Sequence, residues 1–149
     1  MKVLDFMTKD VTTCTESQTV GDAAKKMIEL GISVMPVVND EGILTGIVTQ
    51  SDFISKEVEI PHALVSIKRL FGQDFNLTDV EDVYKKSKNK TLADVMSHNV
   101  VTVTSENTLN GVVELMMSKH LKRIPVVDDG KLVGMITRKD ILKAFEKLS

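Results

Sequence analysis

Two short segments of the chain place a hydroxyl and a carboxylate at the same spacing. Thr49 is followed three residues later by Asp52, and Thr137 is followed three residues later by Asp140. A carboxylate can accept both hydroxyls of a ribose, and a threonine at a helix start presents its hydroxyl and nearby N–H groups to an anion. This combination suits a phosphorylated nucleoside. The spacing is also close to that of a helix capping box, so the residues leave capping, ligand binding and a dual role open.

The two segments belong to two copies of one longer unit. The run Met35-Pro36-Val37-Val38 returns as Ile124-Pro125-Val126-Val127, and Gly46-Ile47-Val48-Thr49 returns as Gly134-Met135-Ile136-Thr137. Further upstream, Asp5-Phe6-Met7-Thr8 returns as Asp94-Val95-Met96-Ser97. One residue, Glu41, is lost at a turn, where a change in length is tolerated. The chain therefore contains a tandem repeat.

Each copy has the pattern of a β-α-β-β-α unit. In the first copy, β-branched residues predict strands over 11–14, 34–38 and 44–49. Apolar residues at helical spacing predict a helix that follows an N-cap at Thr19 and ends at Gly31, and a second helix over 52–55. The second copy repeats the order, with strands that begin at 100–103, an N-cap at Thr108 and a last helix over 140–148. The fold class is therefore α/β (α+β).

We divide the chain into a first repeat (1–57), a linker (58–91) and a second repeat (92–149). In the linker, apolar residues at helical spacing predict a helix over 62–71, and Thr78 with Glu81 predicts the start of another. The first linker helix has to bury its apolar stripe against the repeats or a partner subunit. The Lys-rich stretch at 85–90 is interpreted as a solvated linker rather than an anion-binding patch.

Composition excludes several classes of function. The 149 residues carry a net charge of −2, which lacks the basic excess of a dedicated nucleic-acid binder. Cys14 is the only cysteine, its neighbours suggest a buried thiol, and the three histidines show no metal-ligand spacing. No window has the roughly 18 apolar residues of a membrane span, so we expect a soluble, cytoplasmic protein.

On the repeated motifs quoted above, the sequence resembles the CBS-domain pair, also called a Bateman module. The resemblance covers both repeats, and it implies that the two units pack through their sheets with pseudo-twofold symmetry. It also implies two clefts that bind adenosine nucleotides or related compounds, such as AMP, ADP, ATP or S-adenosylmethionine, with no cofactor required. Members commonly form homodimers, as flat assemblies of four repeat units.

The resemblance assigns candidate residues to each cleft. The Thr-x-x-Asp of one copy is implied to face the first strand and the pre-proline residues of the other. Cleft one then contains Thr49, Asp52, Thr102, Lys122, Arg123 and Ile124. Cleft two contains Thr137, Asp140, Thr13, Val34 and Met35, with Arg138 near its mouth.

Only the second copy offers cations before its proline, so we expect cleft one to prefer phosphorylated ligands and cleft two to tolerate a neutral or less phosphorylated adenosyl group. Lys122 and Arg123 also suit the C-terminal end of a helix dipole, which leaves a purely structural role open for them. Thr13 and Thr102 can equally be ordinary strand residues.

The residues favour a regulator over an enzyme, because no nucleophile, base or metal cluster is evident. A scaffold that only dimerises is the alternative, and it would need Asp52 and Asp140 as caps alone. Any regulated target is expected to be a separate protein, which the sequence does not name. An exposed apolar stripe on the last helix predicts a homodimer, unless the linker helix of the same chain covers it: Ile141, Leu142, Phe145 and Leu148.

Overall fold

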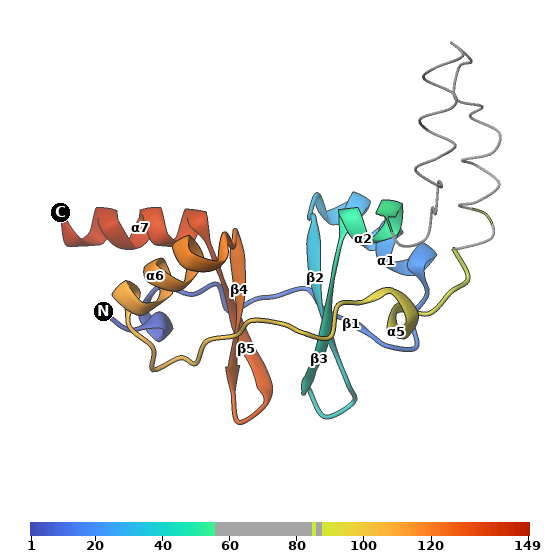
Figure 1. Cartoon of the computed structure of the whole chain (residues 1–149), viewed down its shortest axis with the longest axis horizontal. Helices are drawn as coiled ribbons and strands as arrows, with labels where there is room; N and C mark the ends of the chain where they lie inside the picture. Colours follow the sequence, from blue (N-terminus) through green and yellow to red (C-terminus); the bar gives the residue numbers. More distant parts are fainter. Residues whose placement is uncertain (56–84, 86–87) are drawn as a thin grey trace, which may run out of the picture.

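The computed structural model describes residues 1–55, 85 and 88–149. The linker helices expected over 62–71 and from Thr78 lie outside the described residues. Figure 1 shows the strands of the two repeats toward the middle of the molecule and the helices on the outside. The elements, in chain order, are η1 (Val3–Asp5), β1 (Cys14–Thr15), α1 (Val20–Leu30), β2 (Val34–Val38), β3 (Leu44–Thr49), α2 (Gln50–Ser55), α5 (Leu92–Val95), α6 (Leu109–Lys119), β4 (Arg123–Asp128), β5 (Lys131–Thr137) and α7 (Arg138–Leu148).

The two repeats have the same sheet pattern. In the first repeat β2 pairs antiparallel with β3, and β1 lies parallel to β2. In the second repeat β4 pairs antiparallel with β5, and the first strand is reduced to a single parallel bridge between Val103 and Val126. The strands predicted over 34–38 and 44–49 are confirmed, whereas β1 is shorter than the predicted 11–14 and begins at Cys14.

Local sequence explains where the longer helices begin and end. Thr19 caps α1 by accepting the Asp22 N–H at 3.1 Å, and Asp22 binds the Thr19 N–H in return. Thr108 caps α6 in the same way by accepting the Gly111 N–H. Both predicted caps are confirmed. Helix α1 ends at Gly31 in the left-handed conformation, and His120 adopts that conformation at the end of α6.

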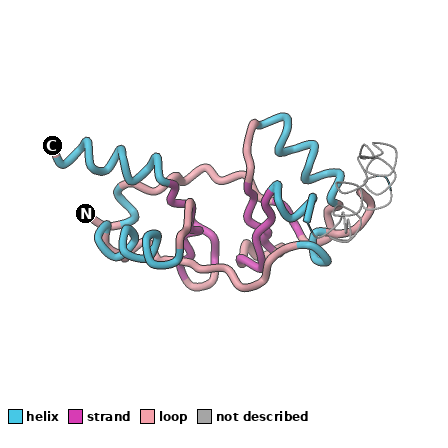
Figure 2. The backbone as a smooth tube through the Cα atoms, turned by 45° about the horizontal axis from the view of Figure 1, so that its top comes forward, coloured by secondary structure: helices cyan, strands magenta, loops and turns pink. Residues whose placement is uncertain are grey.

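The opening segment of each repeat packs against the other repeat. Val3 and Phe6 lie in the core of the second repeat, whereas Leu92 and Val95 lie in the core of the first. Figure 2 shows two loop segments running between the repeats. The crossing segments are fixed to the sheets by reciprocal backbone bonds, between Thr8 and Met135 and between Ser97 and Ile47. These equivalent bridges are related by the pseudo-twofold symmetry of the pair.

The glycine of the repeated motif makes this crossing sterically feasible. A Cβ at Gly134 would lie 2.8 Å from the Thr8 carbonyl oxygen and 2.8 Å from Met7 Sδ. A Cβ at Gly46 would lie 3.0 Å from the Ser97 carbonyl oxygen and closer still to the side chain of Met96. Both glycines therefore leave room for the segment that arrives from the other repeat.

Candidate functional site

A cleft of about 300 Å³ lies between the repeats. The second repeat contributes Thr137 at the junction of β5 and α7, together with Arg123, which pairs with Thr137 in the sheet register. The first repeat contributes the segment before β1 and the residues that lead into β2, among them Thr8, Asp10, Thr12, Ser33 and Val34. This pocket corresponds to the cleft two expected from the sequence, and we keep that name for it.

Beside cleft two, Asp140 is held by groups from both repeats. The residue is 5% exposed, and its carboxylate accepts hydrogen bonds from the Thr137 N–H at 2.9 Å and the Thr137 hydroxyl at 3.0 Å. The Thr8 hydroxyl of the other repeat also donates to it, at 3.0 Å to one oxygen and 3.2 Å to the other. The capping box predicted as one alternative is therefore present. The additional bond to Thr8 fixes the carboxylate at the inter-repeat boundary.

Asp52 occupies the equivalent place in the first repeat. It is 8% exposed, and its carboxylate accepts the Thr49 N–H at 2.8 Å and the Thr49 hydroxyl at 3.2 Å. The Thr49 hydroxyl also lies 2.8 Å from the hydroxyl of Ser51. Both Thr-x-x-Asp motifs thus fix a buried carboxylate where a strand passes into a helix.

The other expected site residues lie in several environments. Val34 and Arg123 line cleft two with Thr137, so Arg123 lies in this pocket although the expectation placed it with Thr49. Met35 and Ile124 are fully buried in the cores. The backbone carbonyl of Thr13 accepts a hydrogen bond from the Lys26 ammonium group at 2.9 Å. Its neighbour Thr12, and not Thr13, lines cleft two.

The remaining cationic and hydroxyl candidates lie outside cleft two. Thr102 lines a smaller pocket of about 210 Å³, which also contains Thr45 and His98. Lys122 is exposed. Arg138 lines a groove between α6 and α7 instead of the pocket that contains Thr137. The binding roles of these residues stay predictions.

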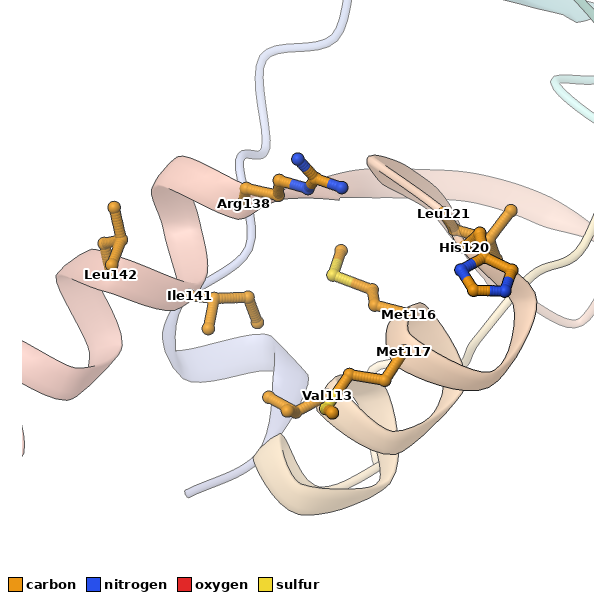
Figure 3. Close-up of a pocket in the computed structure, with 8 residues that line it drawn as sticks. All are labelled: Val113, Met116, Met117, His120, Leu121, Arg138, Ile141 and Leu142. Atoms are coloured by element: carbon orange, nitrogen blue, oxygen red, sulfur yellow. The ribbon is translucent and has the colours of Figure 1, made fainter.

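The groove between α6 and α7 has a volume of about 550 Å³ and an apolar floor. Figure 3 shows Met116 and Ile141 between the two helices, with Arg138 and His120 at one end and Leu142 at the other. The exposed side chains of Met117 and Leu142 also line it, so this face of the second repeat presents apolar surface to solvent.

Cys14 is a core residue, as its apolar neighbours indicated. The side chain is 2% exposed, and burial raises the pKa of the thiol to about 11, although nearby Lys26 acts in the opposite direction. Across the described part of the chain, no three His, Cys, Asp or Glu side chains gather in a group able to hold a metal ion. Of the helices that the structure describes, none combines the length and the apolarity needed to cross a membrane.

Thr8 and Asp10 are two of the residues of cleft two that sequence reasoning missed. Thr8 belonged to the repeated run 5–8, and its partner position in the second copy, Ser97, also carries a hydroxyl. That shared hydroxyl was the available signal. Asp10 corresponds to Asn99, so the repeat itself gave no reason to select it.

Comparison with known proteins places this geometry in one family. The CBS domain profile matches residues 3–59 and 92–147. The chain is 32% identical over 144 residues to the uncharacterized protein MJ1225 of Methanocaldococcus jannaschii, covering 95% of this chain and 46% of that protein. The chain thus spans about half the length of this relative.

Two solved structures of similar proteins contain adenosine compounds. CBSX2 of Arabidopsis thaliana in complex with AMP is 25% identical, with a TM-score of 0.72 over 99% of this chain and 97% of that one. The CBS domain pair of protein MJ0100, in complex with 5′-methylthioadenosine and S-adenosyl-L-methionine, is also 25% identical, with a TM-score of 0.69 over 100% and 98%. Since the family profile matches both repeats and the fold is that of the solved pairs, the chain belongs to the CBS-domain family as a tandem CBS pair.

Proposed function

We propose that this CBS pair is a regulatory module that binds an adenosine nucleotide or a related adenosyl compound between its repeats. The observation that carries the proposal is the convergence at cleft two of Thr137, Arg123 and the buried carboxylate of Asp140 with residues of the other repeat. The adenosine ligands bound by CBSX2 and MJ0100 support it. The module acts in the cytoplasm and signals to a separate target protein rather than catalysing a reaction itself.

Each group at cleft two has a chemical role in this proposal. A carboxylate offers about four acceptor positions, and the three donors supplied by Thr137 and Thr8 leave Asp140 about one position for a ribose hydroxyl. The Arg123 guanidinium supplies a cation beside them. A ligand bound there contacts both repeats at once, and so favours one mutual arrangement of the repeats that a target can recognise.

We expect an adenosyl ligand to stabilise the folded chain. A compound present at about 100 times its Kd, and bound only by the native state, raises the free energy of unfolding by about 2.7 kcal/mol. Thermal unfolding monitored against AMP, ADP, ATP, S-adenosylmethionine and adenosine measures this effect, with guanosine compounds as matched controls. If calorimetry detects no heat and the melting temperature stays constant with every adenosyl compound, the dimerising scaffold becomes the better description.

We further propose that the pair forms a homodimer through the outer helices. Exposed apolar side chains on α7 form a stripe beside the α6–α7 groove: Leu142, Phe145 and Leu148. The first repeat exposes Ile28 at the position equivalent to Met117, and these side chains are 81% and 72% exposed. Both repeats thus offer apolar surface at matching positions, and a twofold homodimer would bury the same patches on both chains.

Phe145→Asp is expected to convert such a dimer into a monomer, because a carboxylate would be buried without a partner at the interface. Light scattering should report about twice 16.5 kDa for the wild type and that mass for the variant. Leu4→Asp is a matched control, since Leu4 is as exposed as Phe145 but lies on η1. A wild-type mass near that of one chain at micromolar concentration would contradict the dimer.

A further inference from the structure

We propose that cleft two selects adenosyl compounds whose 5′ side chain carries a cationic as well as an anionic group, and that Asp10 is the residue that sets this preference. The inference rests on the proposed function, because it concerns the ligand of the same cleft. Its chemical basis is a pair of opposite charges that line one pocket without neutralising each other.

Asp10 and Arg123 both line cleft two, and they come from different repeats. Among the described residues, the ion pairs join only Lys2 with Glu106 and Lys25 with Glu29, so neither Asp10 nor Arg123 is paired. Asp10 is exposed and makes no side-chain hydrogen bond within that part of the chain. Its carboxylate is therefore available to a ligand in the pocket.

Asp10 lies on the same crossing segment as Thr8, the residue that holds the carboxylate proposed to bind the ribose. Asp10 follows Thr8 by two residues, and the Thr8 hydroxyl binds the Asp140 carboxylate. Arg123 pairs with Thr137, whose N–H and hydroxyl bind the same carboxylate. The unpaired anion and the unpaired cation thus lie on the two segments that hold Asp140.

This arrangement disfavours a ligand with negative charge alone. A phosphate group near the ribose would be attracted by Arg123 and repelled by Asp10, and these effects oppose each other. A sulfonium or ammonium group gains from Asp10, while a carboxylate on the same ligand gains from Arg123. The combination of an anion and a cation is specific to cleft two, because the position equivalent to Asp10 in the second copy is the neutral Asn99.

The test compares three probes on the full chain: S-adenosylmethionine, the neutral 5′-methylthioadenosine, and AMP. Met135 lines cleft two and is largely buried, so the NMR signal of its 13C-labelled methyl group reports binding at this cleft. The variant is Asp10→Asn. The matched control is Asp40→Asn, which removes the same charge from an exposed turn between β2 and β3.

In Asp10→Asn we expect the Kd of S-adenosylmethionine to rise about threefold and that of AMP to fall about threefold, as suits a partly solvated charge contact. The Kd of 5′-methylthioadenosine should not change, and Asp40→Asn should alter none of the three. Arg123→Gln provides a second variant, in which AMP should lose more affinity than 5′-methylthioadenosine.

The outcomes separate this inference from the proposed function. If the wild type binds these compounds but Asp10→Asn changes all three affinities equally, or none of them, the charge selection is overturned and the adenosyl site stands. The same conclusion follows if Arg123→Gln weakens AMP and 5′-methylthioadenosine equally. If none of the three probes moves the Met135 signal or the melting temperature of the wild type, the proposed function itself fails.

Discussion

Gly134→Ala is expected to lower the free energy of unfolding by about 1–3 kcal/mol, the usual cost of overpacking a well-packed site. The added methyl group would lie 2.8 Å from the Thr8 carbonyl oxygen, which is backbone and cannot rotate away. That carbonyl accepts the Met135 N–H at 2.9 Å, so relief of the clash displaces the bridge between the repeats. The variant should therefore also lose affinity at cleft two, because the displaced backbone on both sides of this bridge, at Thr8 and Met135, lines the pocket.

Chemical denaturation of Gly134→Ala and Gly46→Ala would measure this cost. We expect the larger loss at Gly134, because at Gly46 the closest atoms belong to the flexible side chain of Met96 and the nearest backbone oxygen is 3.0 Å away. Gly111→Ala is a suitable control, since outside the backbone of its own helix the described residues place just the Thr108 hydroxyl near the added methyl group, at 3.3 Å. Equal stability of Gly134→Ala and Gly111→Ala would show that the crossing segment tolerates the methyl group.

The elements that follow from local patterns were predicted well. Strands β2 and β3 have the predicted bounds, because both contain β-branched residues and the turn residues at 39–42 separate them. The caps at Thr19 and Thr108 follow from hydrogen bonds within four residues of the chain. These interactions depend on near neighbours in the sequence, and a single sequence contains that information.

The crossing of the opening segments could not be predicted in this way. The segments around Val3 and Leu92 are too short to show a periodicity, and each packs on a sheet distant in sequence. The sequence repeat identified the two structural units, but it did not indicate which of the two cores each opening segment joins. Gly134 and Gly46 were recognised as motif residues. Their lack of a side chain is explained by the segment of the other repeat, which passes directly over them.

The sequence predicted the local geometry of the two Thr-x-x-Asp motifs, whereas the ligand-binding role of their residues stays a prediction. Asp52 and Asp140 are both buried beside the threonines three residues earlier. Thr8 and Asp10 entered the site through the crossing, so the sequence offered only the hydroxyl shared by Thr8 and Ser97 as a signal for the first and none for the second. Arg123 lines cleft two because it lies opposite Thr137 in the β4–β5 sheet, and Thr137 lines the same pocket.

Asp140→Asn is the substitution expected to change ligand affinity most. Replacement of a carboxylate that accepts charge-assisted hydrogen bonds costs roughly 1.5–3 kcal/mol, so the Kd at cleft two should rise about 10- to 150-fold. The sequence alone suggested that the fold would survive this change intact. The structure adds a stability cost of about 1 kcal/mol, because Asn brings an amide N–H₂ to a position where Thr8 and Thr137 both donate.

Two further variants separate the binding role of Asp140 from its structural role. Thr8→Val removes the hydroxyl that crosses the repeat boundary but keeps the carboxylate, so stability should fall while the acceptor for ribose hydroxyls remains. Asp52→Asn makes the same chemical change in the other Thr-x-x-Asp motif, and it should leave the Met135 signal responsive to ligand. If Asp140→Asn loses stability as Thr8→Val does but binds adenosyl compounds with unchanged Kd, the carboxylate acts as a cap alone.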